Sequence, residues 1–397
     1  MTAVPKLTVP GLRRPMQKSD YLHILKELVA FPTVSADSNL ALIDYVEALL
    51  DGHGYRTSRR FNEDGSKSNL VARIGPETSG GIALSGHTDV VPVSGQDWTT
   101  DPFELAEKDG HLFGRGTSDM KGFIALALAA ACAVDAGKMR KPLHLIFTYD
   151  EETGCHGARC LRDELYGWPD KPRFALIGEP TGMQLVTAHK GIQSLAMRVR
   201  GKPAHSSRPN LGASAIRYAA RFVAGIEASL PQDSDANFDP PTATFNIGTI
   251  RGGEAINIIP EWCELRWEFR HLPTQDPAKI HRKLTQVADD LRAEMPGISV
   301  ETRILADVPG LEAGANRDIV LDLRRFIQSP EPHVTAVPFV TEGGLFQQAG
   351  IPAVICGPGL LEQAHQPDER VSVTAMNDYG RFLTRAIADG TMQPKVE

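Results

Sequence analysis

The sequence predicts an α/β fold in which a mostly parallel sheet is covered by helices on both faces, plus an inserted ferredoxin-like α+β domain. Three observations support this prediction. The chain has 397 residues, which is enough for two domains. Apolar runs of strand type alternate with helical patterns over residues 1–185 and 304–397, as in parallel sheets with two covered faces. Residues 186–303 follow the order strand, helix, strand, strand, helix, strand, which is the split βαβ order.

The first segment begins with an arm, at residues 1 to about 18, and then alternates helices with apolar strands. Apolar side chains recur at helical spacing from residue 20 onward, as at Leu22, Leu25 and Leu28. Gly54 and Gly137 are placed to end two later helices. We expect helices at 20–30, 39–53 and 121–136 and strands at 69–74, 82–85, 143–149 and 174–177.

The inserted segment has a different pattern. Leu195, Met197 and Val199 alternate with polar or small residues, as in a strand with one exposed face. We expect strands at 195–199, 242–250, 263–269 and 298–304, helices at 213–229 and 276–295, and a loop at 231–241. After the insert we expect helices at 318–328, 344–349 and 374–388 and a strand at 353–356.

Composition excludes several classes of function. The net charge of −7 gives no electrostatic footprint for nucleic acid or for an anionic membrane. No apolar run reaches the length of a transmembrane helix, and the N-terminus has no apolar core of a secretory signal. The cysteines are odd in number and mostly lie in apolar runs, so we expect reduced, buried thiols in a cytoplasmic protein. They are Cys132, Cys155, Cys160, Cys263 and Cys356.

The stretch I-A-L-S-G-H-T-D-V-V-P, residues 82–92, ends an apolar strand with two polar groups. His87 and Asp89 are two positions apart, so on a strand they point to the same face. This spacing suits a metal-ligating histidine whose second ring nitrogen donates to a carboxylate. A turn histidine capped by a nearby Asp is an alternative that fits this stretch equally well.

A glycine-rich turn, G-R-G-T-S-D-M-K-G, precedes the helix expected at 121–136. Gly114 and Gly116 have dinucleotide-binding spacing, but Asp119 stands where the third glycine should be. A carboxylate there would repel a pyrophosphate. Asp119 is therefore either a metal ligand or, taken alone, a helix N-cap.

Carboxylates follow two further apolar strands. Asp150, Glu151 and Glu152 come directly after the strand at 143–149, and Glu179 follows the strand at 174–177. Ligands bind at the carboxyl ends of strands in sheets of this kind. Adjacent carboxylates at the end of a buried strand cost free energy unless a cation neutralises them. A solvated surface turn is the alternative, but the preceding apolar strand argues against it.

A fifth ligand candidate, His365, lies in the loop after the last expected strand. One zinc takes roughly four ligands, and two imidazoles and three carboxylates make two zinc sites if one carboxylate bridges the metals. Glu151 is then free to act as a base. No thiolate takes part, so the set suits zinc, cobalt or manganese. The expected ligands are His87, Asp119, Glu152, Glu179 and His365.

The motifs, in their order, resemble the di-zinc aminoacylase, carboxypeptidase and deacetylase family of metallohydrolases. They are S-G-H-T-D-V-V-P, G-R-G-T-S-D-M-K-G, T-Y-D-E-E-T-G-C, I-G-E-P-T, G-K-P-A-H-S-S and Q-A-H-Q-P-D-E. The resemblance implies that Asp119 bridges two zinc ions, with Co²⁺ as a possible substitute. It implies that His87 and Glu179 complete one site, and that Glu152 and His365 complete the other.

The same resemblance assigns further roles. It implies that Asp89 is the partner of His87 and that Glu151 is the general base. It implies that residues 1–185 and 304–397 form the catalytic domain and that 186–303 form a lid and dimerisation domain. His205, in that insert, matches a histidine that reaches the neighbouring subunit's site and binds the oxyanion. A homodimer is therefore expected.

Segments outside the expected metal ligands resemble the acetylornithine deacetylase branch of the family. They include S-N-L-A-L-I-D-Y-V, N-E-D-G-S-K-S-N-L-V-A-R-I-G-P and T-E-G-G-L-F-Q-Q-A-G-I-P. This implies hydrolysis of N-acetylornithine to ornithine and acetate, a step of arginine biosynthesis. Asn257 and Arg270 match positions that hold the substrate carboxylate, although a turn Asn and a strand-edge Arg are the alternatives. The role of Glu342 is left open.

Rival functions exist within and outside this class. Within it, a succinyl-diaminopimelate desuccinylase, a general aminoacylase or a small carboxypeptidase would share the metal ligands. A non-catalytic binding homologue would require a missing ligand or base, and none is missing from the sequence. A nucleotide-dependent enzyme is disfavoured by Asp119 and by the lack of a Gly-x-Gly-x-x-Gly turn.

Overall fold

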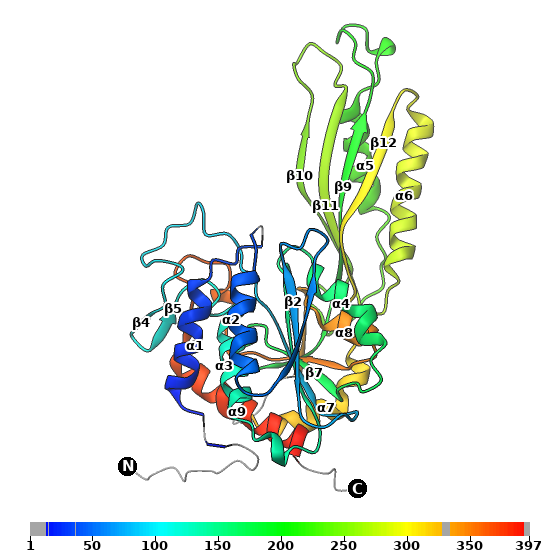
Figure 1. Cartoon of the computed structure of the whole chain (residues 1–397). Coiled ribbons are helices and arrows are strands. Elements are labelled where there is room, and N and C mark those ends of the chain that lie inside the picture. The colour runs from blue at the N-terminus through cyan, green and yellow to red at the C-terminus, as the bar shows by residue number, and fades with distance from the viewer. Residues whose placement is uncertain (1–12, 15, 36, 328–333, 393–397) are drawn as a thin grey trace. The chain divides into compact units, whose positions relative to one another are not determined.

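A computed structural model of the chain describes residues 13–14, 16–35, 37–327 and 334–392 (Figure 1). The chain divides into two compact units. The first contains the described residues up to 187, those between 313 and 335, and those from 341 onward. The second contains 188–312 and 336–340. Most of the arm expected at 1 to about 18 lies outside the described residues.

An eight-stranded sheet forms the centre of the first unit. Its central strands β6, β3, β7 and β14 run parallel, and the pairs β1–β2, β2–β6 and β14–β8 are antiparallel. In spatial order the strands are β1 (Arg56–Phe61), β2 (Ser68–Ile74), β6 (Leu143–Thr148), β3 (Ile82–His87), β7 (Phe174–Ile177), β14 (Ala353–Ile355), β8 (Leu185–His189) and β13 (Val334–Val337). The prediction of a mostly parallel sheet is thus confirmed in its centre.

Helices cover both faces of this sheet, as predicted (Figure 1). One face carries α1 (Lys18–Ala30), α2 (Leu40–Asp51), α3 (Lys121–Cys132), α7 (Arg317–Arg324) and α9 (Val373–Met392), whose buried side chains share one core cluster. The other carries α4 (His156–Tyr166) and α8 (Gly343–Gln348). Among the described residues, no helix combines the length and the apolar character needed to cross a membrane.

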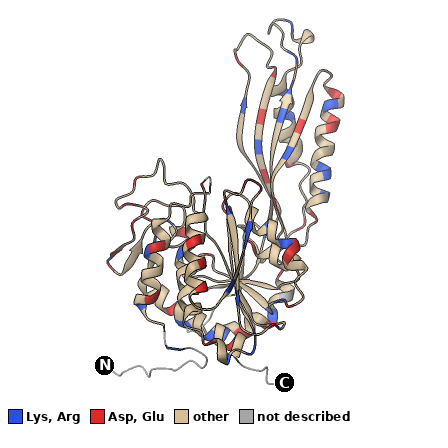
Figure 2. Ribbon diagram, viewed as in Figure 1, with Lys and Arg blue, Asp and Glu red and all other residues tan. Residues whose placement is uncertain are grey.

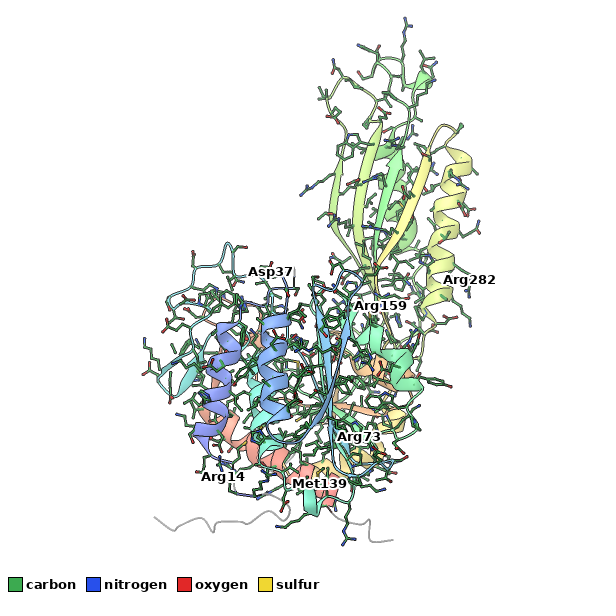
Figure 3. The ribbon with its side chains drawn as sticks, in the orientation of Figure 1. Arg14, Asp37, Arg73, Met139, Arg159 and Arg282 are labelled. Carbon is green, nitrogen blue, oxygen red and sulfur yellow. The ribbon has the colours of Figure 1, made fainter. Side chains whose placement is uncertain are left out.

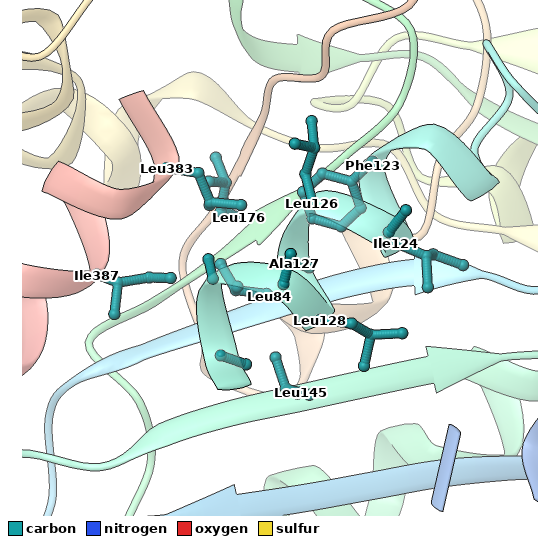
Figure 4. Close-up of a cluster of buried hydrophobic side chains, with 14 of the residues drawn as sticks. Leu84, Phe123, Ile124, Leu126, Ala127, Leu128, Leu145, Leu176, Leu383 and Ile387 are labelled. Atoms are coloured by element: carbon teal, nitrogen blue, oxygen red, sulfur yellow. The ribbon is translucent and has the colours of Figure 1, made fainter. Parts of the chain in front are cut away.

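Helix α3 is the most deeply buried of these elements, since every residue from Lys121 to Ala131 is buried. Its many alanines allow it to lie close to the sheet and to α1 and α9. Figure 4 shows its Phe123 and Leu126 among Leu84 of β3, Leu176 of β7 and Leu383 of α9. Such burial stabilises by roughly 25 cal/mol per Å² of apolar surface. The side chains that fill the space between sheet and helices are drawn in Figure 3.

Several element boundaries and whole elements differ from the predictions. Helix α3 ends at Cys132 rather than at 136, and α2 is capped by Gly52, two residues before Gly54. Strand β1 and helix α4 were not predicted, because their charged residues obscure the apolar period. The other missed strands are β8, β13 and a three-stranded sheet of β15 (Arg370–Ser372), β5 (His111–Phe113) and β4 (Ala106–Lys108), most of them too short to show a period.

The second unit has the ferredoxin-like arrangement. Its antiparallel sheet has the order β10 (Thr244–Gly252), β11 (Trp262–His271), β9 (Gly191–Arg200) and β12 (Ser299–Val308). Helices α5 (Ala215–Glu227) and α6 (Pro277–Glu294) pack on one face, against Leu195, Trp267 and Phe269. The other face is polar, and Figure 2 shows acidic and basic residues along these strands and along α6. Because β12 continues to Val308, the unit extends beyond the predicted end at 303.

All five cysteines are free thiols. Cys155, Cys263 and Cys356 are buried and Cys132 is partly buried, but Cys160 is exposed. The prediction of a buried thiol is therefore wrong for Cys160, which lies on the outer part of the unpredicted helix α4.

Candidate metal centre

Polar residues gather where the parallel strands of the first unit end. β3 ends at His87, and His87 pairs with Thr148, the last residue of β6. Glu151 and Glu152 follow β6 after a short turn, and Glu179 follows β7. Since β6, β3 and β7 are adjacent and parallel, their carboxyl ends meet at one edge of the sheet.

Glycine allows the chain to pass close to α3 immediately before Glu179. A Cβ atom at Gly178 would lie 1.8 Å from the ring of Phe123. Any larger residue would push the strand end away from the helix, and Glu179 would move with it. The Ile-Gly-Glu-Pro sequence is therefore explained by packing as well as by chemistry.

The predicted ligands lie close together. His87 Nε2 is 3.1 Å from Asp119 Oδ1, and His365 Nε2 is 3.1 Å from Glu152 Oε1. His365 Nε2 is also 3.5 Å from the other Asp119 oxygen, Oδ2. The two oxygens of Asp119 thus face two different histidines, which is the arrangement expected of a bridging carboxylate.

Two sets of ligand atoms are compact enough to hold a metal. His87, Glu151 and Glu179 offer atoms within 4.8 Å of one another, and so do His87, Asp119 and Glu152. His365 contacts the second set through Glu152 and Asp119. All five predicted ligands and Glu151 therefore come together, from segments far apart in the sequence.

Burial and mutual repulsion raise the pKa of the carboxyls of Glu151 and Glu179 well above the usual range. The pKa of Glu152 is also raised, first by burial and then by Asp119. Hydrogen bonds with Asp119 and Glu152 raise the pKa of His365 to about 10. Burying so many carboxylates together is costly, and a cation would offset that cost.

The donor set fits two divalent metals. It consists of imidazole nitrogens and carboxylate oxygens without thiolates. Glu179 is 5% exposed, and its Oε1 is buried with no hydrogen-bond partner among the described residues. A buried carboxylate oxygen without a donor is costly, and a cation would satisfy it. His87, Glu179 and Asp119 would hold one metal, and Glu152, His365 and Asp119 the other.

Asp89 contacts more than the sequence indicates. His87 Nδ1 lies 2.9 Å from the backbone carbonyl oxygen of Asp89 and 3.6 Å from its carboxylate, so the backbone is the closer acceptor. The carboxylate of Asp89 accepts hydrogen bonds from the backbone amides of Glu151, at 3.1 Å, and Glu152, at 3.3 Å. Ser35 Oγ donates to it at 2.8 Å. Asp89 therefore holds the acidic turn as well as the histidine.

Glu342, whose role the sequence left open, is a buried carboxyl at the same strand ends. It accepts hydrogen bonds from Thr148 Oγ1 and from Ser85 Oγ, the latter at 3.2 Å. Burial raises the pKa of Glu342 to about 7. These hydrogen bonds link Glu342 to both β3 and β6, close to the end of β3 at His87. The sequence feature that could have indicated this buried position is an acidic residue among small and apolar residues, in T-E-G-G-L-F.

Three predicted residues lie in the second unit. His205 is exposed, and its Nδ1 is 2.8 Å from Ser207 Oγ. The neighbouring amide of Ser206 donates to the carbonyl of Asn257 at 3.0 Å, so His205 and Asn257 lie on adjoining loops. Arg270 lies near the opposite end of β11, where it contacts Glu268 at 3.0 Å and the carbonyl of Pro338 at 3.3 Å.

Comparisons with known proteins can now be set beside this geometry. The family model described as "Peptidase family M20/M25/M40" matches residues 83–389. A protein of Myxococcus xanthus named acetylornithine deacetylase is 38% identical over 391 residues, which are 96% of this chain and 98% of that protein. A Yersinia pestis protein of the same name is 35% identical over 395 residues, 96% of this chain and all of its own length.

Solved structures with the same fold are more distant in sequence. An M20 family metallo-carboxypeptidase from Sulfolobus solfataricus has a TM-score of 0.77 and 18% identity, covering 94% of this chain and 99% of its own. A tripeptidase from Staphylococcus aureus has a TM-score of 0.74 and 21% identity, covering 95% of this chain and 99% of its own. These likenesses support the fold, and they span both units.

Proposed function

This chain belongs to peptidase family M20/M25/M40, and from that premise we propose that it hydrolyses N-acetylornithine to ornithine and acetate. The relatives named acetylornithine deacetylase match it at 35–38% identity along almost the whole chain, including the second unit. The observation that carries the reaction type is the position of Glu151. It is an acidic side chain beside the ligand Glu152, inside a cluster that already has enough donors for two metals.

The metals are proposed to be two zinc ions, with cobalt as a substitute. Bound divalent metals lower the pKa of a water and polarise an acyl carbonyl oxygen. The residues proposed to hold them are the five that the sequence indicated. Asp119 would be shared, because its two oxygens face different histidines.

Glu151 is proposed as the proton carrier. Its carboxylate accepts a proton as a water attacks the acetyl carbon, and it then donates that proton to the leaving nitrogen as the amide bond breaks. Cys155 Sγ donates a hydrogen bond to Glu151 Oε1 at 3.5 Å. The products are acetate and ornithine with a free α-amino group.

The second unit is proposed to act as lid and dimerisation domain. His205 would donate a hydrogen bond to the developing oxyanion in the neighbouring subunit. Asn257 and Arg270 would bind the substrate carboxylate, and because they lie near opposite ends of β11 they would come from different subunits. The adjoining positions of His205 and Asn257 are consistent with joint action on one substrate. We place the enzyme in the cytoplasm, in arginine biosynthesis.

A panel of N-acyl amino acids tests this proposal. After chelation with EDTA, the protein should be inactive, and zinc or cobalt should restore activity together with two bound metals per chain. N-acetylornithine should give the highest kcat/KM, and N-succinyl-diaminopimelate should be much poorer. A reversed ranking of the two substrates would show that the protein belongs to another branch of the family. One tightly bound metal with full activity would contradict the bridging role of Asp119.

A further inference from the structure

Glu369 is a buried carboxylate, 1% exposed, that accepts four hydrogen bonds from a single loop. Its Oε1 accepts from the backbone amides of Ser118, at 2.8 Å, and Asp119, at 3.0 Å. Its Oε2 accepts from the amide of Gly116, at 3.0 Å, and from Arg115 Nη1, at 2.6 Å. Both oxygens are thus engaged, and the backbone nitrogen of Asp119 is one of the donors.

The loop that Glu369 holds has no regular secondary structure. Residues 114–119 belong to neither a strand nor a helix, and Gly116 has a φ of +87°. Such a loop has no ladder of backbone hydrogen bonds to fix it, so its amides need another acceptor. Glu369 provides this acceptor for three of them. It therefore fixes the backbone from which the Asp119 side chain projects.

Arg115 extends the contact to the loop of His365. Its side chain is 1% exposed, and Nη2 lies 2.5 Å from Gln96 Oε1. Gln96 Nε2 in turn donates to the backbone carbonyl of His365 at 2.8 Å. A continuous chain of hydrogen bonds therefore joins Asp119, Glu369, Arg115, Gln96 and His365.

His365 has few other constraints on its backbone. It lies between a short 3-10 turn and β15, with a φ of +63° and an exposed side chain. His87, by contrast, is the last residue of a strand in the middle of the large sheet. The two sides of the metal centre thus differ in what positions their histidines.

We propose that Glu369, Arg115 and Gln96 form a positioning network that holds Asp119 and His365 together, and that this network sets the affinity of the second metal site. Here the second site means that of Glu152, His365 and Asp119. The inference rests on the proposed ligand roles of these residues. None of the three network residues is a proposed metal ligand. Glu369 and Gln96 act through the backbone of Asp119 and His365, and Arg115 connects these two side chains. A carboxylate buried at this point is useful because a charge-assisted acceptor binds amides more strongly than a neutral one.

Metal binding by Glu369→Gln, Arg115→Gln and Gln96→Ala tests the network. Bound metal is counted after dialysis against limiting zinc, and cobalt titration followed by visible absorption gives both affinities. We expect weaker binding of the second metal, by about 10–100-fold, as for outer-shell partners of other metal ligands. The first metal shares Asp119 but keeps His87 and Glu179, so we expect a smaller loss there. Arg115→Gln is matched by Arg60→Gln, which removes the partly exposed Arg60–Glu164 ion pair of the same unit and should retain two metals.

Gln96→Ala tests the network even if the other variants fail to fold, because it removes no buried charge. Gln96 is only partly buried, so circular dichroism of this variant should match that of the wild type. If folded Glu369→Gln and Gln96→Ala proteins bind both metals with wild-type affinity, the network has no positioning role. That result overturns this inference but leaves the proposed two-metal site standing. A wild-type chain that binds fewer than two metals would overturn the two-metal site as well. The substrate assignment is not involved, since metal is counted without substrate.

Discussion

Asp89 Oδ1 lies 3.1 Å from the backbone nitrogen of Glu151. The two residues follow different strands, β3 and β6, so this hydrogen bond joins the turn after the first metal-ligating histidine to the turn that carries the proposed base. The same carboxylate also binds the amide of Glu152. One buried side chain, 2% exposed, therefore positions a proposed base and a proposed ligand together.

Replacing Asp89 by Ala should reduce both turnover and metal affinity. The amides of Glu151 and Glu152 would lose their acceptor, and the turn would no longer be fixed. We expect a loss of about 10–100-fold, as for other groups that orient metal ligands. Steady-state kinetics and metal analysis measure the two effects. Ser35→Ala, which removes one hydrogen bond to Asp89 but leaves the turn in place, should have a smaller effect. Equal losses in the two variants would contradict this role for Asp89.

Glu151 and Glu152 are adjacent but should respond differently to substitution. Glu151→Ala should retain two metals and lose turnover by at least the roughly 10²–10⁴-fold typical of general-base removal. Glu152→Gln should lose one metal, because Glu152 is the proposed ligand that contacts His365. Metal analysis and single-turnover kinetics on both variants separate the two roles. Loss of a metal from the Glu151 variant would identify Glu151 as a ligand, in keeping with its closeness to His87 and Glu179.

Subunit mixing tests the proposed dimer. His205→Ala and Glu151→Ala homodimers should both be nearly inactive. A mixed dimer has one site with an intact Glu151 and the other subunit's intact His205, whereas its second site lacks both. Mixing should therefore restore about half the activity of a wild-type dimer, by counting sites in a two-fold assembly. Subunit exchange is verified with differently tagged chains. Exchange without recovered activity would mean that His205 acts within its own subunit or takes no part.

The pH dependence of stability should depend on His144, in the middle of the large sheet. His144 is 1% exposed, its ring lies 5.2 Å from that of Trp168, and neither ring nitrogen has a partner among the described residues. Burial, followed by Arg73, lowers its pKa from 6.5 to about 4. Between these values the unfolded chain binds a proton that the native state excludes. Stability is thus full above pH 6.5 and is lost as the pH falls toward 4.

This effect should amount to about 2 kcal/mol of unfolding free energy at pH 5, from the linkage between pKa and stability. Urea unfolding of His144→Leu, compared with the wild type at pH 7.5 and pH 5, should show a correspondingly smaller loss on acidification. His23→Gln, a change at an exposed histidine of α1, should keep the wild-type loss. An unchanged loss in His144→Leu would show that other groups cause the acid sensitivity.

The sequence by itself indicated the class of fold and the chemistry of the site. Strands such as 143–149 and 174–177 are apolar runs, interrupted only by His144 and Thr148, because both faces of a central parallel strand are buried. The polar residues directly after them cannot be buried without partners, so His87, Glu152 and Glu179 stand out in the sequence. Strand β1 and helix α4 do not stand out, because partly exposed elements need little apolar character.

Only the tertiary structure decided how the ligands are held. Asp119 and His365 are 246 positions apart in the sequence, and no local pattern shows that Glu369, Arg115 and Gln96 connect them. The same holds for Asp89, whose spacing indicated a contact with His87 but not the hydrogen bonds to the turn after β6. Ligand type follows from the chemistry of single side chains, which a sequence displays directly. Ligand position follows from hydrogen bonds between loops distant in the chain, and these exist only once the sheet has brought the strand ends together.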